Sequence, residues 1–180
     1  MMKVLFLDVD GVLNGHEFDD EAKSCNIRRE CVKHLNRVVR ETGCRIVLSS
    51  AWRYMVHGGA MTLKGFGYML RTHGLLAECG SSNLIIGLTR RDDESVDPKD
   101  LREDERARQV KDWLEWWGDK VACYGEICRE PARPVTAFAA VDDEEQGFAL
   151  HGIPAVITDG KRGMTAEDAD RLIAILGRAG

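Results

Sequence analysis

The chain has 180 residues, of which 44% are hydrophobic and 31% are charged, and its formal net charge is −5. This length and composition predict one globular domain, with residues 1–180 forming a single unit. The negative charge argues against a protein that binds nucleic acid through bulk electrostatics. It is compatible with an enzyme that contacts only the end of a strand. No apolar run is long enough to span a membrane, and the N-terminal apolar stretch is interrupted by Asp8, so we expect a cytoplasmic protein without a membrane partner.

The six cysteines are scattered along the chain and form no close pairs at zinc-site spacing, so we expect them to be reduced and structural.

Residues 3–7 form an apolar run that predicts a buried strand, followed at once by Asp8, Asp10 and Gly11. Two acids at the carboxyl end of a strand repel each other unless a cation or a polar substrate lies there, and ligands bind at that end of open α/β sheets. Gly11 allows a sharp turn without a side chain in the way. The alternative interpretation is an ordinary acidic turn after a buried strand.

The run Asp-Val-Asp-Gly-Val-Leu at residues 8–13 resembles the first motif of the haloacid dehalogenase (HAD) superfamily. The resemblance implies that Asp8 is a nucleophile that forms an aspartyl-phosphate, and that Asp10 is the general acid and then the general base. It also implies that Mg²⁺ binds Asp8 and the Asp10 main-chain carbonyl, and that Gly11 belongs to the phosphate-binding loop. Carboxylates suit this chemistry, because one can attack phosphorus while a second one moves the proton.

Residues 15–26 are polar and could form a flap, and residues 27–42 have the spacing of a helix, capped by Asn26 and ended by Gly43. Its basic stripe, Arg29, Lys33, Arg37 and Arg40, favours a solvated face over a nucleic-acid patch.

Residues 44–49 predict the next strand. It ends in serines, where the resemblance places the phosphate-binding hydroxyl; Ser50 is favoured over Ser49 because Ser-x-Trp resembles a Thr-Gly-Trp ending.

Residues 54–89 are harder to interpret, although Thr62 could cap a helix that ends at Gly74, and residues 84–88 predict a short strand. Residues 90–105 carry mixed charges and Pro98, which predicts an exposed loop. A helix follows over residues 106–117. The resemblance places a phosphate-binding cation near its start, for which Arg106 is the best match, followed by Arg102, Arg108 and Lys99.

Residues 135–141 predict a strand that again ends in acids, Asp142 and Asp143. Oxygen ligands at this position suit Mg²⁺, and the pair resembles the fourth HAD motif. Asp143 is then the metal ligand and Asp142 the partner of the phosphate-binding cation. The chain closes with a strand over residues 155–158 and a helix over residues 166–176, which Thr165 and Asp168 should cap.

Taken together, the motifs predict an α/β fold of the Rossmann-like HAD type, a three-layer sandwich with a central parallel sheet and a minimal cap. The chain looks most like the small HAD domains associated with RNA-repair multi-enzyme proteins. The resemblance implies a Mg²⁺-dependent phosphomonoester hydrolase, with a nucleotide, a nucleic-acid end or a small metabolite as substrate. Two rival interpretations stay open: a catalytically silent HAD-like binding or regulatory module, and a receiver-type domain. A receiver carries its phosphorylated aspartate on a later strand, where this chain has Ser49 and Ser50.

Overall fold

The computed structural model describes residues 2–15, 27–75, 84–89, 104–119 and 134–178, with the side chains of residues 116–119 left out. The flap predicted at residues 15–26 and the charged loop predicted at residues 90–105 lie almost wholly outside the described residues. Of the six cysteines, Cys31 and Cys44 are described, and both are free thiols that are buried.

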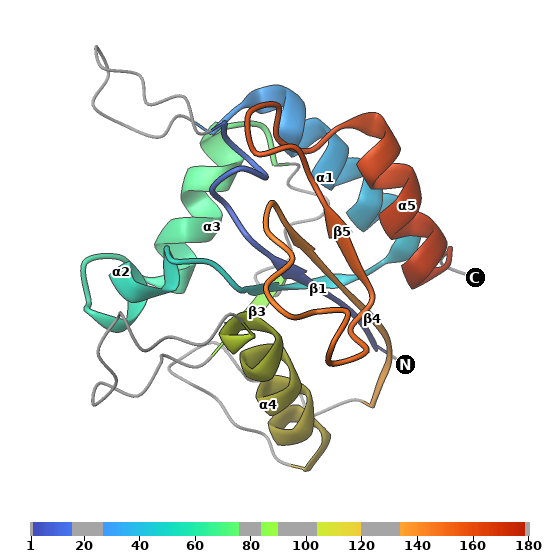
Figure 1. Ribbon diagram of the computed structural model, residues 1–180. Helices are drawn as coiled ribbons and strands as arrows, with labels where there is room; N and C mark the ends of the chain where they lie inside the picture. Colours follow the sequence, from blue (N-terminus) through green and yellow to red (C-terminus); the bar gives the residue numbers. More distant parts are fainter. Residues whose placement is uncertain (1, 16–26, 76–83, 90–103, 120–133, 179–180) are drawn as a thin grey trace.

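A five-stranded sheet, parallel throughout, forms the centre of the described structure, with the strand order β3-β2-β1-β4-β5 (Figure 1). Its strands are β1 (Met2–Leu7), β2 (Arg45–Leu48), β3 (Ile85–Leu88), β4 (Val135–Asp142) and β5 (Ala155–Ile157). β1 lies in the middle, between β2 and β4, which explains why its sequence is continuously apolar from Val4 to Leu7. The predicted α/β class and the parallel sheet are confirmed.

Helices cover both faces of this sheet. The helices are α1 (Arg29–Thr42), α2 (Arg53–His57), α3 (Leu63–Thr72), α4 (Glu105–Asp119) and α5 (Ala166–Leu176). Leu5 and Leu7 of β1 pack toward α1, α3 and α5, whereas Val4 and Phe6 pack toward α4. This alternation divides the core into two layers, one on each side of the sheet. The edge of the Trp113 ring contacts Phe6 across the α4 layer, at 5.4 Å between ring centroids.

The helix ends show where local sequence signals were sufficient. Thr165 and Asp168 form the predicted capping box of α5, and the Thr62 hydroxyl caps α3 by accepting from the Gly65 N–H. α1 begins two residues later than predicted, because Arg28 has extended backbone angles and its N–H donates to the Leu13 carbonyl. α2 was not predicted at all.

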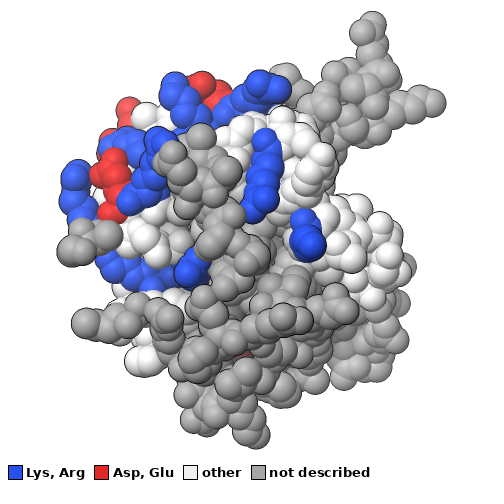
Figure 2. Space-filling view, turned by 180° about the vertical axis from the view of Figure 1, so that it is seen from behind, with Lys and Arg blue, Asp and Glu red and all other residues white. Residues whose placement is uncertain are grey.

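Two of the four basic residues on the solvated face of α1, Lys33 and Arg37, pair with neighbouring acids. Figure 2 shows Lys and Arg side chains gathered on the side turned away in Figure 1, with acidic side chains among them. Arg37 pairs with Glu41 and Asp170, and Lys33 pairs with Glu30 at 3.0 Å. These pairs fit the solvated face that the sequence favoured.

Among the helices of the described segments, none combines the length and the hydropathy that crossing a membrane requires.

Candidate active site

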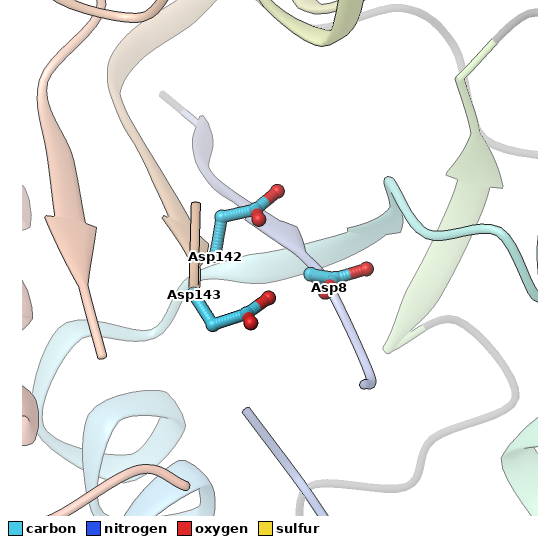
Figure 3. A group of neighbouring side chains, drawn as sticks. All are labelled: Asp8, Asp142 and Asp143. Atoms are coloured by element: carbon cyan, nitrogen blue, oxygen red, sulfur yellow. The ribbon is translucent and has the colours of Figure 1, made fainter. Parts of the chain in front are cut away.

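Three aspartates meet where β1 and β4 end. Asp8 directly follows β1, while Asp142 closes β4 and Asp143 comes next. The parallel pairing of Leu7 with Val141 brings Asp8 beside Asp142. The three side chains each offer an oxygen, and these atoms lie within 4.8 Å of one another (Figure 3). Asp8 and Asp142 are buried, at 4% and 2% exposure, so the charge of this cluster is poorly screened by solvent.

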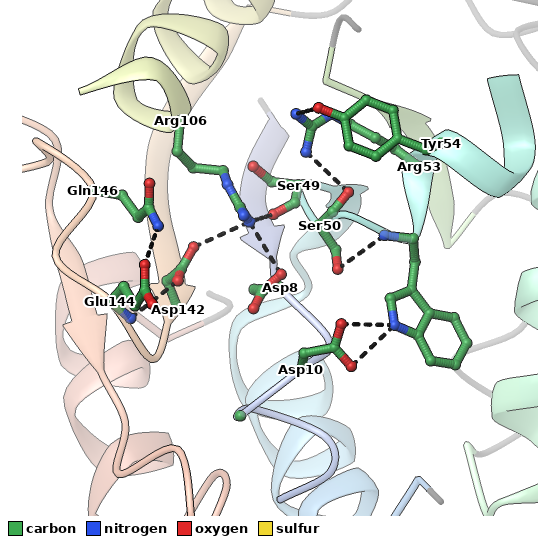
Figure 4. Close-up of polar contacts among 12 residues, drawn as sticks. Asp8, Asp10, Ser49, Ser50, Arg53, Tyr54, Arg106, Asp142, Glu144 and Gln146 are labelled. Carbon is green, nitrogen blue, oxygen red and sulfur yellow. Dashed lines mark hydrogen bonds and ion pairs between the residues drawn. The ribbon is translucent and has the colours of Figure 1, made fainter. Parts of the chain in front are cut away.

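Arg106 in the first turn of α4 bridges two of these carboxylates. Its Nη1 atom lies 3.0 Å from Asp8 Oδ1 and 3.2 Å from Asp142 Oδ2, and it also donates to the Ser49 carbonyl (Figure 4). One guanidinium therefore faces the ends of β1, β2 and β4 at once. A planar cation at this position can also bind the oxygens of a phosphoryl group.

The start of α4 is held in place by the loop that follows β4. The Asp104 carboxylate contacts His151 Nε2 at 2.8 Å and accepts from Arg108 Nε at 2.9 Å. A Cβ atom on Gly147 would lie 2.5 Å from the Asp104 Cβ, so the close approach requires glycine there. Arg108, which the sequence also offered as the phosphate-binding cation, is thus paired away from the three aspartates. Arg102 and Lys99, offered for the same role, lie outside the described residues.

The two serines after β2 differ in their surroundings. The Ser50 hydroxyl faces the Asp8 carboxylate and acts to lower its pKa, and the Ser50 hydroxyl oxygen accepts from the Trp52 N–H at 3.3 Å. The Ser49 hydroxyl is buried and has no hydrogen-bond partner among the described residues, whereas its carbonyl binds Arg106. This geometry favours Ser50 as the hydroxyl that faces the aspartate cluster.

Asp10 lies apart from the three clustered carboxylates. Its Oδ1 accepts from Asn14 Nδ2 at 2.8 Å, and both of its oxygens accept from Trp52 Nε1, at 3.1 and 3.0 Å. The side chain of Asp10 is thus not part of the candidate metal cluster. The predicted metal contact of Asp10 is through its main-chain carbonyl, and it stays a prediction.

Gly11 occupies a position that a side chain could not share with Asp143. Its φ is +70°, and a Cβ atom would lie 2.4 Å from the Asp143 Cγ and 2.6 Å from its Oδ2. Its N–H donates to Asn14 Oδ1 at 2.9 Å and its carbonyl accepts from Thr158 Oγ1 at 2.9 Å. Gly11 therefore lets the loop after β1 approach the end of β4.

Burial dominates the electrostatics of this site. It raises the pKa of Asp8, against the opposing effects of the Arg106 guanidinium, the Ser50 hydroxyl and the Val9 N–H. Burial also raises the pKa of Asp142 to about 7, where Arg106 opposes the shift and the Asp8 carboxylate adds to it. Burial works against the charge of Arg106, but Asp142 and Asp8 outweigh it and raise its pKa, so the guanidinium stays charged. Negative charge on both carboxylates is costly without a further cation.

The raised pKa of Asp142 predicts a stability profile for the metal-free protein. An unfolded aspartate titrates near its model value of 3.8, so between about pH 4 and pH 7 the folded state holds a proton that the unfolded state has released. The free energy of unfolding should therefore fall as pH rises through this window, by about 4 kcal/mol at most. Urea unfolding in chelator at pH 5 and at pH 7.5 measures this fall in the free energy of unfolding. Asp142→Asn should flatten the profile, while Asp112→Asn, an exposed position of α4, should not; identical profiles for wild type and Asp142→Asn would contradict the assignment.

A separate cavity of about 490 Å³ opens between the starts of α1 and α5. Arg28, Cys31, His34 and Arg162 are among its lining residues, and none of the clustered aspartates is. We therefore assign it no part in the chemistry of the aspartate cluster.

Residues 4–169 match the family model described as the HAD domain in Swiss Army Knife RNA repair proteins. The chain belongs to this HAD family. The predicted membership of the superfamily and the association with RNA repair are thereby confirmed. Searches of curated proteins and of solved structures each found no significant match.

For a HAD domain, the family points to a phosphohydrolase-type function, and the three clustered aspartates could bind a metal ion. The structure brings together most of the residues that the sequence analysis singled out: Asp8, Ser50, Arg106, Asp142 and Asp143 share one site, with Gly11 beside Asp143. Sequence reasoning missed the contacts of Asp10 with Trp52 and Asn14, and the role of Asp104 in holding α4. Trp52 stands in the Ser-x-Trp ending and Asn14 directly follows the first motif, but no periodicity indicates where their side chains point.

Proposed function

We propose that this HAD domain is a Mg²⁺-dependent phosphomonoester hydrolase that removes a terminal phosphate from an RNA end or a nucleotide. The observation that carries the proposal is the bridge from Arg106 to Asp8 and Asp142, at 3.0 and 3.2 Å, within a cluster of three aspartates. This arrangement sets a buried carboxylate nucleophile beside a fixed cation, which is what phosphoryl transfer needs from a protein.

The proposed reaction has two steps that use the same two aspartates. An Asp8 oxygen attacks phosphorus and forms an aspartyl-phosphate, the bond from phosphorus to the leaving oxygen breaks, and Asp10 gives that oxygen its proton. Water then attacks the phosphorus of the aspartyl-phosphate, Asp10 takes the proton of that water, and the bond to Asp8 breaks. The products are the free hydroxyl and inorganic phosphate, with both aspartates restored.

The residues of the cluster fit a magnesium ion. Asp8 and Asp143 offer hard oxygen ligands, with the Asp10 main-chain carbonyl as a third, while Asp142 is engaged by Arg106. The absence of a side chain at Gly11 leaves the Asp143 carboxylate its place. When bound, Mg²⁺ would offset the negative charge that the substrate phosphate adds to these buried carboxylates.

The RNA end as substrate rests on the family description and on the charge of the chain. The family is described as the HAD domain in RNA repair proteins. A net charge of −5 disfavours long contact with a phosphate backbone, so a terminal phosphate is the part of the RNA that this domain would engage.

The test is phosphate release from four substrates: RNA oligonucleotides carrying a 5′- or a 3′-phosphate, nucleoside monophosphates and an aryl phosphate. We expect release that requires magnesium and stops with chelator, with one of the RNA ends as the best substrate. Binding of phosphorylated RNA without turnover of any of the four substrates would instead support the catalytically silent module.

Arg106 offers a test of the phosphate-binding assignment. Arg106→Ala should lower kcat/KM by about 100-fold or more, because it removes the donor and leaves two buried carboxylates without their cation. Arg106→Lys should be intermediate, since an ammonium keeps the charge but not the planar fork. Arg108→Ala is the matched control, being two residues away and paired with Asp104. Equal activity of Arg106→Ala and Arg108→Ala would mean that another cation binds the phosphate.

A further inference from the structure

Trp52 makes a contact that the proposed chemistry does not yet explain. Its indole Nε1 donates to both oxygens of Asp10, at 3.1 Å to Oδ1 and 3.0 Å to Oδ2, as the two dashed lines at Asp10 in Figure 4 mark. Asn14 Nδ2 donates to Oδ1 as well, at 2.8 Å. Oδ1 thus accepts twice, whereas Oδ2 accepts from Trp52 alone among the described residues.

The indole of Trp52 is itself fixed from two directions. Its ring packs edge-on against the buried Phe66 of α3, with centroids 6.3 Å apart and an interplanar angle of 62°. Its main-chain N–H donates to the Ser50 hydroxyl at 3.3 Å. Trp52 therefore connects Asp10, after β1, with Ser50, after β2. An indole N–H can only donate, so it holds an acceptor such as a carboxylate in one orientation.

We propose that Trp52 is a positioning residue that sets the Asp10 carboxylate for proton transfer to the leaving group. This inference rests on the proposed function. Oδ1 accepts from two donors and Oδ2 from one, so Oδ2 is the less engaged oxygen and the atom that carries the proton to the leaving oxygen as its bond to phosphorus breaks. General acid catalysis depends on this alignment, because the proton must lie within hydrogen-bond reach of the oxygen that departs.

A packing role for Trp52 would have a different consequence from a positioning role. Loss of packing would loosen the whole site and slow every substrate alike. Loss of the orienting N–H would slow the departure of a leaving group that needs a proton, such as the ribose hydroxyl of an RNA end. It would spare the departure of the acidic phenol of an aryl phosphate, which leaves as the anion.

The experiment compares Trp52→Phe with wild type on a phosphorylated RNA end and on p-nitrophenyl phosphate. We expect kcat/KM on the RNA end to fall about 10- to 100-fold, and kcat/KM on the aryl phosphate to change less than about threefold. The ratio kcat/KM is the readout because it reports the step in which the leaving group departs, and not the later attack of water that Asp10 assists on every substrate. In an Asp10→Asn background Trp52→Phe should cause no further loss, because both changes remove the same proton transfer. Equal losses on both substrates, or a full further loss beside Asp10→Asn, would overturn the proposal.

Phe66→Leu is the control for packing, since it disturbs the ring contact and leaves the indole N–H in place. If Trp52→Phe fails to fold, benzothienylalanine at position 52 keeps the shape of the indole and removes the N–H. The contact is also tested without turnover: the indole proton resonance of Trp52, identified by its loss in Trp52→Phe, should shift in Asp10→Asn and stay in place in Asp112→Asn. An unmoved resonance would overturn the contact even if the domain hydrolyses nothing, so the two proposals can fail separately.

Discussion

Replacing Asp8 with asparagine should abolish phosphate release, with a loss of at least about 10³-fold in kcat. An amide oxygen cannot form the acyl phosphate, and no other carboxylate of the described site comes at the same position beside Arg106 and Ser50. The measurement is phosphate release from RNA ends and from an aryl phosphate, each with magnesium and with chelator.

The same substitution should not destabilise the metal-free protein. Burial raises the pKa of Asp8, so its ionised form is costly in the fold, and a neutral amide also relieves the repulsion between Asp8 and Asp142. We therefore expect the free energy of unfolding of Asp8→Asn in chelator at pH 7.5 to equal or exceed that of wild type. Asp112→Asn is the matched control and should keep full activity. Turnover by Asp8→Asn at the wild-type rate would remove Asp8 as the nucleophile.

The sheet could be predicted from the sequence because each of its strands has a local run of apolar or β-branched residues. Residues 4–7 are continuously apolar and form most of the central strand, where both faces are covered by helices. Gly43 ends α1 with a φ of +68°, in the left-handed conformation that favours glycine. In contrast, α2 has five residues, too few to show a helical period, and its N-cap Trp52 makes no side-chain capping bond. Nothing in its sequence could have predicted it.

The candidate site was predictable to the extent that it depends on strand ends. Asp8, Ser50 and Asp142 each follow or close a parallel strand, so the topology alone gathers them at one edge of the sheet. Arg106 reaches the same edge from a helix. The resemblance already favoured it over Arg108 from the sequence, and in the structure Arg106 faces the aspartates while Arg108 pairs with Asp104. The direction of a single side chain, such as the Trp52 indole toward Asp10, depends on tertiary packing that no local pattern encodes.

Gly11→Ala should have the second largest effect, through the position of Asp143. The new Cβ would lie 2.4 Å from the Asp143 Cγ, too close for both to keep their places, so the Asp143 carboxylate must move. A displacement of about 1 Å in such a site can cost about 100-fold in rate, and we expect at least that loss of kcat/KM. The stabilisation that magnesium gives to the folded protein, measured as the rise of the unfolding midpoint over that in chelator, should also shrink.

Part of any loss of stability in Gly11→Ala would come from the backbone. Gly11 has a φ of +70°, and an alanine held at such a φ costs about 1–2 kcal/mol at any position. Gly152→Ala separates the two contributions. Gly152 has a φ of +66°, but a Cβ atom there would meet nothing within 4 Å, so its alanine variant carries the backbone strain without the collision. Gly152→Ala should therefore lose stability while keeping its activity and its response to magnesium. If Gly11→Ala behaved in the same way, the space beside Asp143 would not matter for metal binding, and Asp143 would lose its place as the predicted ligand.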